Sequence, residues 1–169
     1  MHTLNHFKSI AFTHATVGLE RVAKLVIPED AYGERLAAAK TDLGIDELML
    51  VTTCNRVEYY FTTHAAINNK FLRAFFEKLY PQWAEEDVHW AIESTEVMDG
   101  PDAVRHLFHV ASSLDSMVVG EREILTQIRK SFDIADKLGF VGDFLRIALR
   151  KTIENGKQVF TETYIANRP

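Results

Sequence analysis

The feature that most constrains the fold is a pair of short apolar segments, residues 47–51 (ELMLV) and 57–61 (VEYYF), separated by the polar stretch TTCNR. In a strand, the second segment would place three apolar side chains on one face and Glu58 and Tyr60 on the other. Two such runs joined by a short polar connection are typical of a β-hairpin. We therefore predict a hairpin with Cys54 at or near its connection.

The segments around this hairpin complete an α+β pattern. Residues 8–14 (KSIAFTH) alternate as a strand does, and residues 28–43 open with a proline and two acids and continue with helical spacing. Residues 66–80 predict a second helix, and residues 88–94 (VHWAIES) predict a fourth strand. The order β-α-β-β-α-β is the ferredoxin-like arrangement, one antiparallel sheet covered on one face by two helices.

From residue 101 onward, the sequence predicts helices. Residues 121–138 carry apolar side chains at helical spacing, Gly139 and Gly142 mark a turn, and a last long helix is expected over residues 143–163. We therefore divide the chain into a ferredoxin-like unit at 1–100, a helical part at 101–142 and the start of a long helix at 143–169.

Composition excludes several classes of protein. The net charge of −5 over 169 residues excludes a generally basic nucleic-acid surface. No apolar run approaches the ~20 residues of a membrane helix, and no signal peptide is evident. One cysteine cannot form an internal disulfide, which fits a cytoplasmic protein. The eight glycines form neither GxGxxG nor GxxxxGK, so no common loop for a dinucleotide or triphosphate is predicted.

The single cysteine, Cys54, is the first candidate for chemistry. A lone cysteine is most often a small buried hydrophobe. Cys54, however, lies between two predicted strands beside Thr53 and Asn55, and loops held by strands often display reactive groups. Arg56 could favour the thiolate through its charge, or hold an anionic substrate with its planar fork of donors.

The second candidate stretch covers residues 106–127 (HLFHVASSLDSMVVGEREILTQ). His106 and His109 are three apart and share a helix face, but no obvious third ligand accompanies them, so no metal site is predicted. A general acid or base near the thiol is one role for His106, and a partly buried histidine bonded to backbone is the alternative. Asp115 and Ser116 could line a pocket, or could simply cap a helix.

Four segments resemble motifs of the glutamyl-tRNA reductase family. TTCNRVEY (52–59) resembles the family's (S/T)TCNRxE(L/I/V/F)Y, and HLFHVASSLDSMVVGEREILTQIRKSF (106–132) resembles HL…VA(S/A)GLDSxVxGExQIxGQ(V/I)KxA. IAFTHAT (10–16) is similar to the family's opening strand and G(I/L)NHxTA turn, and VFTET (159–163) is similar to its VRTET. The resemblance covers nearly the whole chain.

The resemblance implies a mechanism. In that family a cysteine thiolate attacks the ester of glutamyl-tRNA, and NADPH reduces the resulting thioester to glutamate-1-semialdehyde, the committed step of the five-carbon route to tetrapyrroles such as porphyrins and heme. By motif position the nucleophile is Cys54, and the activity-critical histidine is His106. The implied substrate contacts are Thr53, Asn55, Arg56, Ser116, Glu121, Arg122, Glu123 and Gln127.

The resemblance also implies parts that lie outside this sequence. In the family, a Rossmann domain for NADPH and a helical dimerisation domain follow along a spinal helix. We therefore expect a fragment in which residues 1–142 form the catalytic domain and residues 143–169 begin the spinal helix. The expected substrate is glutamyl-tRNA, with a homodimer and a contact to glutamate-1-semialdehyde aminomutase in the full-length protein, and no membrane contact. The alternative hypothesis is a non-catalytic module that binds tRNA or a protein and has a structural cysteine.

Overall fold

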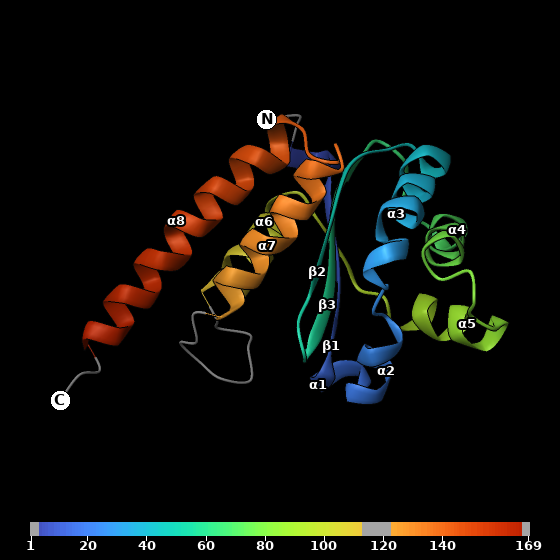
Figure 1. Cartoon of the computed structure of the whole chain (residues 1–169), viewed down its shortest axis with the longest axis horizontal. Coiled ribbons are helices and arrows are strands. Elements are labelled where there is room, and N and C mark those ends of the chain that lie inside the picture. Colours follow the sequence, from blue (N-terminus) through green and yellow to red (C-terminus); the bar gives the residue numbers. More distant parts are fainter. Residues whose placement is uncertain (1–3, 113–122, 167–169) are drawn as a thin grey trace.

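The computed structural model describes residues 4–112 and 123–166, with side chains except for Glu123 and the residues after Asn155. Figure 1 shows the strands standing between two groups of helices. No helix in the described part is long and apolar enough to cross a membrane.

In chain order the elements are η1 (Leu4–His6), β1 (Phe7–Thr13), α1 (His14–Val17), α2 (Leu19–Lys24), α3 (Glu29–Leu43), β2 (Ile45–Thr52), β3 (Arg56–Thr63), α4 (Asn69–Leu79), α5 (Glu85–Ser94), β4 (Val97–Asp99), α6 (Pro101–Ala111), α7 (Glu123–Lys137) and α8 (Asp143–Ala166).

The strands form one sheet in the order β2-β3-β1-β4, and every neighbouring pair is antiparallel. The predicted ferredoxin-like α+β fold is therefore confirmed. β2 and β3 pair as the predicted hairpin, with Leu50 opposite Tyr59 and Thr52 opposite Val57. The alternation in β3 specifies this register, because a slip of one residue would turn its apolar side chains to the opposite face.

One predicted strand is wrong. Residues 88–94, expected as the fourth strand, belong to helix α5, and the fourth strand is the shorter β4 that follows it. Three consecutive acids fill the first turn of α5, where the helix dipole favours negative charge, and the Ala84 N–H donates to Asp87 Oδ2 at 3.1 Å. Val88 and Ala91, which are three residues apart, then face the core as a helix requires.

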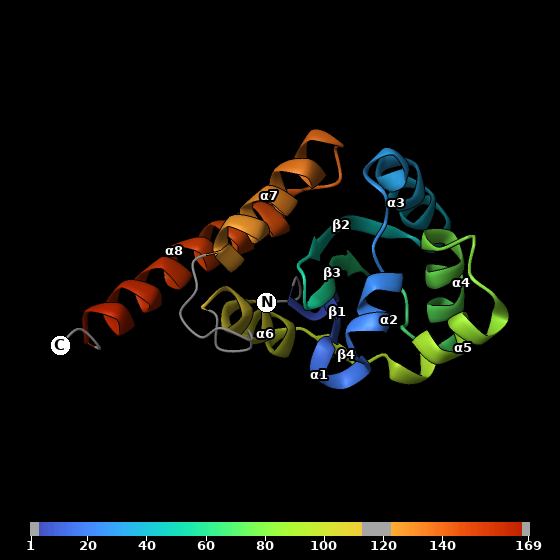
Figure 2. The same ribbon diagram turned by 60° about the horizontal axis from the view of Figure 1, so that its bottom comes forward.

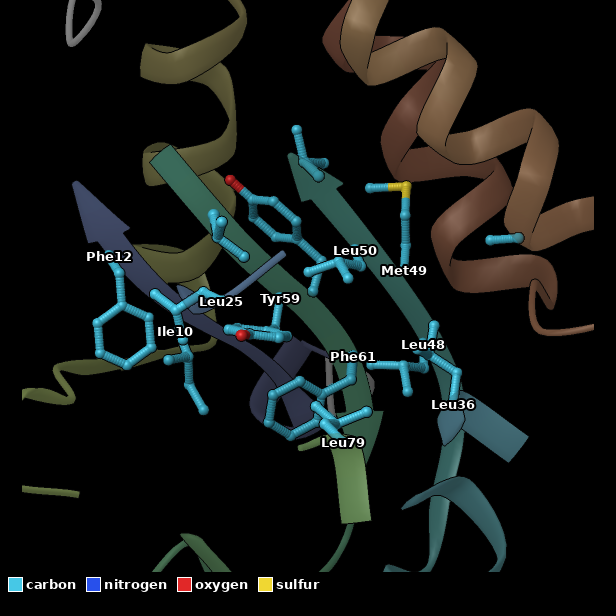
Figure 3. Close-up of a cluster of buried hydrophobic side chains, with 14 of the residues drawn as sticks. Ile10, Phe12, Leu25, Leu36, Leu48, Met49, Leu50, Tyr59, Phe61 and Leu79 are labelled. Atoms are coloured by element: carbon cyan, nitrogen blue, oxygen red, sulfur yellow. The ribbon is translucent and has the colours of Figure 1, made fainter. Parts of the chain in front are cut away.

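One face of the sheet carries an aromatic core beneath α3, α4 and α5 (Figure 1). Tyr59 is buried edge-on to Phe75 with 5.2 Å between ring centroids, and Figure 3 shows Tyr59 and Phe61 on the same side of β3. The Tyr80 hydroxyl donates to the Leu25 carbonyl at 2.6 Å, so its oxygen accepts the hydroxyl of Tyr59. Burial raises the pKa of both phenols, which keeps this pair protonated.

The opposite face is covered by α6, α7 and α8 (Figures 1 and 2). Met49 of β2 is buried on this side, and Figure 3 shows its side chain pointing away from Leu48 and toward the helices. Phe7 of β1 packs against Phe144 of α8 with 4.9 Å between ring centroids. Because helices cover both faces, all eight residues of β3 are buried, including its charged ones.

Glu47 attaches the start of α8 to strand β2. Its Oε1 accepts the N–H of Gly142 at 2.6 Å and of Leu145 at 3.0 Å, and its Oε2 accepts the Thr62 hydroxyl at 3.2 Å. N–H groups at a helix start have no partner within the helix, and their partial positive charge favours a carboxylate. Glu47 thereby determines where α8 leaves the sheet.

Gly142→Ala should weaken this attachment. A Cβ at position 142 would lie 2.9 Å from Glu47 Oε1, so the carboxylate would have to move away from its donors. We expect the free energy of unfolding in urea to fall by about 1–2 kcal/mol, the size of one or two impaired hydrogen bonds. In a Glu47→Ala background the same glycine substitution should cost much less. Equal costs in both backgrounds would contradict the steric explanation.

Candidate active site

The connection between β2 and β3 holds Cys54 at the surface. β2 ends at Thr52 and β3 begins at Arg56, so the turn consists of Thr53, Cys54 and Asn55. The Thr53 N–H donates to the Arg56 carbonyl at 2.9 Å, and the Thr53 hydroxyl donates to Asn55 Oδ1 at 3.0 Å. Cys54 is a free, exposed thiol. A hydrogen-bonded turn between two strands therefore presents this thiol to solvent.

The start of α1 supports the turn from the side. The Asn55 carbonyl accepts the N–H of His14 at 2.8 Å, at the point where β1 passes into α1. Asn55 itself is buried. The two segments IAFTHAT and TTCNR, which are far apart in the sequence, thus meet at the hairpin connection.

Next to the turn, β3 and α6 form a buried ionic cluster of Arg56, Glu58 and His106. The side chains of Arg56 and Glu58 are 2% and 0% exposed, and Arg56 Nη1 lies 3.7 Å from Glu58 Oε2. Glu58 Oε1 is hydrogen-bonded to His106 Nε2. A carboxylate removed from water needs such partners, because an unpaired buried charge costs several kcal/mol.

The ring of His106 is held from two sides. It stacks on Tyr60 with 6.3 Å between ring centroids and 30° between planes, and its Nε2 faces Glu58. A carboxylate accepts a hydrogen bond, so Nε2 carries the proton and Nδ1 is the atom left for other partners. Within the described residues, no hydrogen bond joins His106 to Cys54. The predicted histidine is therefore mostly buried, as one alternative held, but its partner is a carboxylate rather than backbone.

The other predicted site residues lie elsewhere. Gln127 is on α7 and lines a cavity that also contains Thr52. Glu123 is the first residue of α7. Ser116, Glu121 and Arg122 lie outside the residues that the structure describes. The structure thus brings the TTCNR segment and His106 to one end of β3, and places Gln127 beside the strand that precedes the turn.

Glu58 is the site candidate that the sequence reasoning missed. The signal was present, because Glu58 is a single acid between the apolar residues Val57 and Tyr59 of a predicted strand. In a strand with one wet face, that acid would simply point to water. Glu58 is buried because α6 packs over that face of the strand.

In the part of the chain that the structure describes, no three His, Cys, Asp or Glu residues lie close enough to hold a metal ion. His109 is exposed on α6, whereas the side chain of His106 is only 14% exposed. The two histidines therefore differ in their surroundings although they share one helix.

These features define an α+β domain that displays an exposed thiol beside a buried carboxylate–histidine pair. The chain belongs to the glutamyl-tRNA reductase family, because the family model described as "Glutamyl-tRNAGlu reductase, N-terminal domain" matches residues 10–163.

Individual relatives of this chain are glutamyl-tRNA reductases. The chain is 37% identical over 165 residues to glutamyl-tRNA reductase 2 of Koribacter versatilis, covering 96% of this chain and 36% of that protein. It is 36% identical over 156 residues to glutamyl-tRNA reductase of Ignicoccus hospitalis, covering 91% and 33%. The solved structure of glutamyl-tRNA reductase from Methanopyrus kandleri matches with a TM-score of 0.73 at 30% identity, covering 94% of this chain and 35% of that one. The chain therefore spans about a third of the length of these relatives.

Cys54 should be alkylated by iodoacetamide in the folded protein. Because the thiol is exposed, we expect the native rate to lie within a few-fold of the rate in urea, whereas a buried cysteine would react only after unfolding. Mass spectrometry of the intact chain would show a single adduct, and Cys54→Ser is the control without one. Strong protection in the native protein would contradict the exposed position of this thiol.

Breaking the pair between Glu58 and His106 should destabilise the fold. His106→Ala removes one partner of a fully buried carboxylate, and we expect a loss of roughly 3 kcal/mol in the free energy of unfolding. Glu58→Gln keeps an oxygen that can accept from Nε2, so it should cost less. The double variant should cost less than the sum of the single ones, measured by urea denaturation. Strict additivity would mean that the two side chains do not stabilise each other.

Proposed function

We propose that this chain is the acyl-transfer part of a glutamyl-tRNA reductase, in which Cys54 accepts the glutamyl group of glutamyl-tRNA. The observation that carries the proposal is the exposed thiol on a hydrogen-bonded turn, next to the buried cluster of Arg56, Glu58 and His106. Covalent catalysis requires an accessible nucleophile held in place. Exposure of Cys54 also counts against the alternative hypothesis of a structural cysteine in a binding module.

The first proposed step is acyl transfer from oxygen to sulfur. The thiolate of Cys54 attacks the ester carbonyl carbon, a C–S bond forms, and the bond from that carbon to the ribose oxygen of tRNA breaks. The ribose oxygen takes up the proton that the Cys54 thiol has lost and leaves as a hydroxyl group, so the products are free tRNA and a glutamyl thioester on Cys54. This capture divides the reaction, because a thioester accepts hydride more readily than an ester does.

His106 is proposed to supply or hold the proton for the leaving ribose oxygen. Its Nε2 faces Glu58, so a proton would pass through Nδ1. The lack of a described hydrogen bond to Cys54 supports a role toward the leaving group rather than toward the thiol. Glu58 is then a positioning residue, because it acts by fixing the imidazole and the guanidinium of Arg56.

Arg56 is proposed to bind the side-chain carboxylate of the glutamyl group. A guanidinium offers five N–H donors in a planar fork, enough for Glu58 and a second carboxylate. Thr53 and Asn55 would contact the same group from the turn. The family resemblance proposes further contacts from Ser116, Glu121, Arg122, Glu123 and Gln127.

The hydride step is proposed to depend on residues outside this chain. Dinucleotides usually bind where a glycine-rich turn joins a parallel strand to a helix, whereas the described sheet is antiparallel throughout. The described glycines with positive φ lie instead at or near helix ends: Gly18, Gly44, Gly100 and Gly139. The residues that the structure describes therefore do not fit NADPH.

The complete reaction is proposed to follow that of the family. Reduction of the thioester with NADPH would release glutamate-1-semialdehyde for tetrapyrrole biosynthesis. The cofactor site, the homodimer contacts and any contact with glutamate-1-semialdehyde aminomutase would belong to the remaining two thirds of a full-length protein.

Incubation with radiolabelled glutamyl-tRNA should transfer one glutamyl group to Cys54. The bond should be a thioester, so hydroxylamine at neutral pH should release the label from the denatured protein. The amount of hydroxylamine-sensitive label per chain is the measurement. Cys54→Ser should acquire none, and equal labelling of wild type and Cys54→Ser would overturn the proposal.

The same assay separates chemistry from positioning. His106→Asn should slow labelling by about 100-fold, the lower range for a lost general acid. Glu58→Gln should slow it less and change the pH dependence of the rate, because an amide orients the imidazole without its charge. A purely structural role for Glu58 would leave the pH profile of the folded variant unchanged.

A further inference from the structure

A cavity of about 530 Å³ opens between α3, strand β2 and α7, and Gln127 and Thr52 both line it. Figure 2 shows α3 and α7 on either side of β2. The volume falls in the range of roughly 300–1,000 Å³ that is usual for small-molecule sites. At one end Gly33 permits close approach of the two helices, because a Cβ there would lie 3.2 Å from Leu138 Cδ2.

The cavity lies at the outer edge of β2, where α3 from one face of the sheet and α7 from the other face both line it, whereas the ionic cluster lies over β3. Thr52 pairs with Val57, so its side chain is on the α3 face, whereas Arg56 and Glu58 are on the α6 face. Thr52 precedes Cys54 by two residues, a span of at most about 7 Å of chain. A molecule in the cavity would therefore end within reach of the thiol, at the outer edge of β2, whereas Arg56 lies on β3.

The walls of the cavity are apolar and partly exposed. Tyr32, Leu50 and Ile134 contribute to them, and the Tyr32 hydroxyl donates to the Leu50 carbonyl at 3.4 Å. Burial raises the pKa of Tyr32 to about 12, so this ring carries no charge at neutral pH. Val26 and Leu138, which are 47% and 41% exposed, also line the cavity. Exposed apolar surface of this kind is typical of places where another molecule or protein segment binds.

The rim of the cavity is polar and carries more positive than negative charge. Two lysines of α7, Lys130 and Lys137, line the cavity together with one acid, Glu29. Ser131 lies between them in the sequence, with its hydroxyl donating to the Gln127 carbonyl at 2.8 Å. Apolar walls with an aromatic ring suit a nucleobase, and lysines at the rim suit phosphates.

We propose that this cavity receives the 3′-terminal nucleoside of the aminoacyl-tRNA, with Lys130 and Lys137 contacting the adjoining phosphates. The inference rests on the proposed function, since it needs the ester of glutamyl-tRNA at Cys54. The carbonyl carbon of that ester is bonded to the rest of the glutamyl group on one side and to the oxygen of the terminal ribose on the other. With the glutamyl group held by Arg56 over β3 and the ribose oxygen at the turn near His106, the base extends past the outer edge of β2 into the cavity.

The test compares two substrates on the same protein, glutamyl-tRNA and glutamic acid α-ethyl ester, which has no nucleotide. The readout is the ratio of the apparent second-order rate constants for labelling Cys54 with each. Lys130→Ala combined with Lys137→Ala should lower this ratio about tenfold, because only the tRNA has phosphates to lose. Lys70→Ala combined with Lys151→Ala is the matched control, since both lysines are exposed and neither lines the cavity. That control should keep the wild-type ratio.

A second variant tests the shape of the cavity independently of its charge. Ile134→Trp should fill part of the space and lower the same ratio. Adenosine 5′-monophosphate should compete with glutamyl-tRNA in the wild type and compete less in this variant. Cytidine 5′-monophosphate should be weaker, because the terminal nucleoside of tRNA is adenosine.

The outcomes distinguish the two proposals. If wild-type protein gains no label from glutamyl-tRNA, the proposed function fails. If it is labelled but both cavity variants keep the wild-type ratio, the cavity proposal alone is overturned. Binding of adenosine 5′-monophosphate without any effect on tRNA labelling would likewise overturn it, and would assign the cavity to a free nucleotide.

Discussion

Glu58 has no exposure to water, and its charge must be compensated by groups that the fold brings to it. Arg56 comes from the same strand, but His106 comes from α6, 48 residues further along the chain. Docking of α6 on the sheet therefore also fixes the imidazole next to the cysteine turn. Apolar residues of similar size would fill this space at less cost. The proposed chemistry at the turn gives these charges a role that apolar residues could not fill.

Strand β3 organises both sides of the molecule because its side chains alternate. Tyr59 and Phe61 face α4 and belong to the aromatic core, where Tyr59 is bonded to Tyr80. Glu58 faces α6, and two positions along, on the same face, Tyr60 stacks on His106. Further along that face, the hydroxyl of Thr62 donates to Glu47, which holds the start of α8. One strand thus joins the core, the ionic cluster and the long helix.

The sequence alone predicts the elements whose local residue pattern agrees with their tertiary surroundings. The hairpin, the turn position of Cys54 and the helices α3, α4, α7 and α8 follow from periodicity and turn residues. The apolar spacing of residues 88–94 also suits a short strand, and only the three acids before them indicate the start of a helix. Glu58 was missed for a different reason: its role depends on a helix that packs over it from a distant part of the chain, and no local pattern encodes that contact.

The position of the turn would place Cys54 between the two proposed parts of the substrate, the glutamyl group and the terminal nucleoside. Thr52 and Arg56 flank the turn but point to opposite faces of the sheet, toward the cavity and toward the ionic cluster. A nucleophile between them can meet a carbonyl carbon whose two substituents extend in opposite directions. An aminoacyl ester has that form, with a small charged acid on one side and a nucleoside on the other. In the proposed reaction the hairpin would thus display the thiol between two parts of the substrate, with the glutamyl group toward Arg56 over β3 and the base in the cavity at the edge of β2.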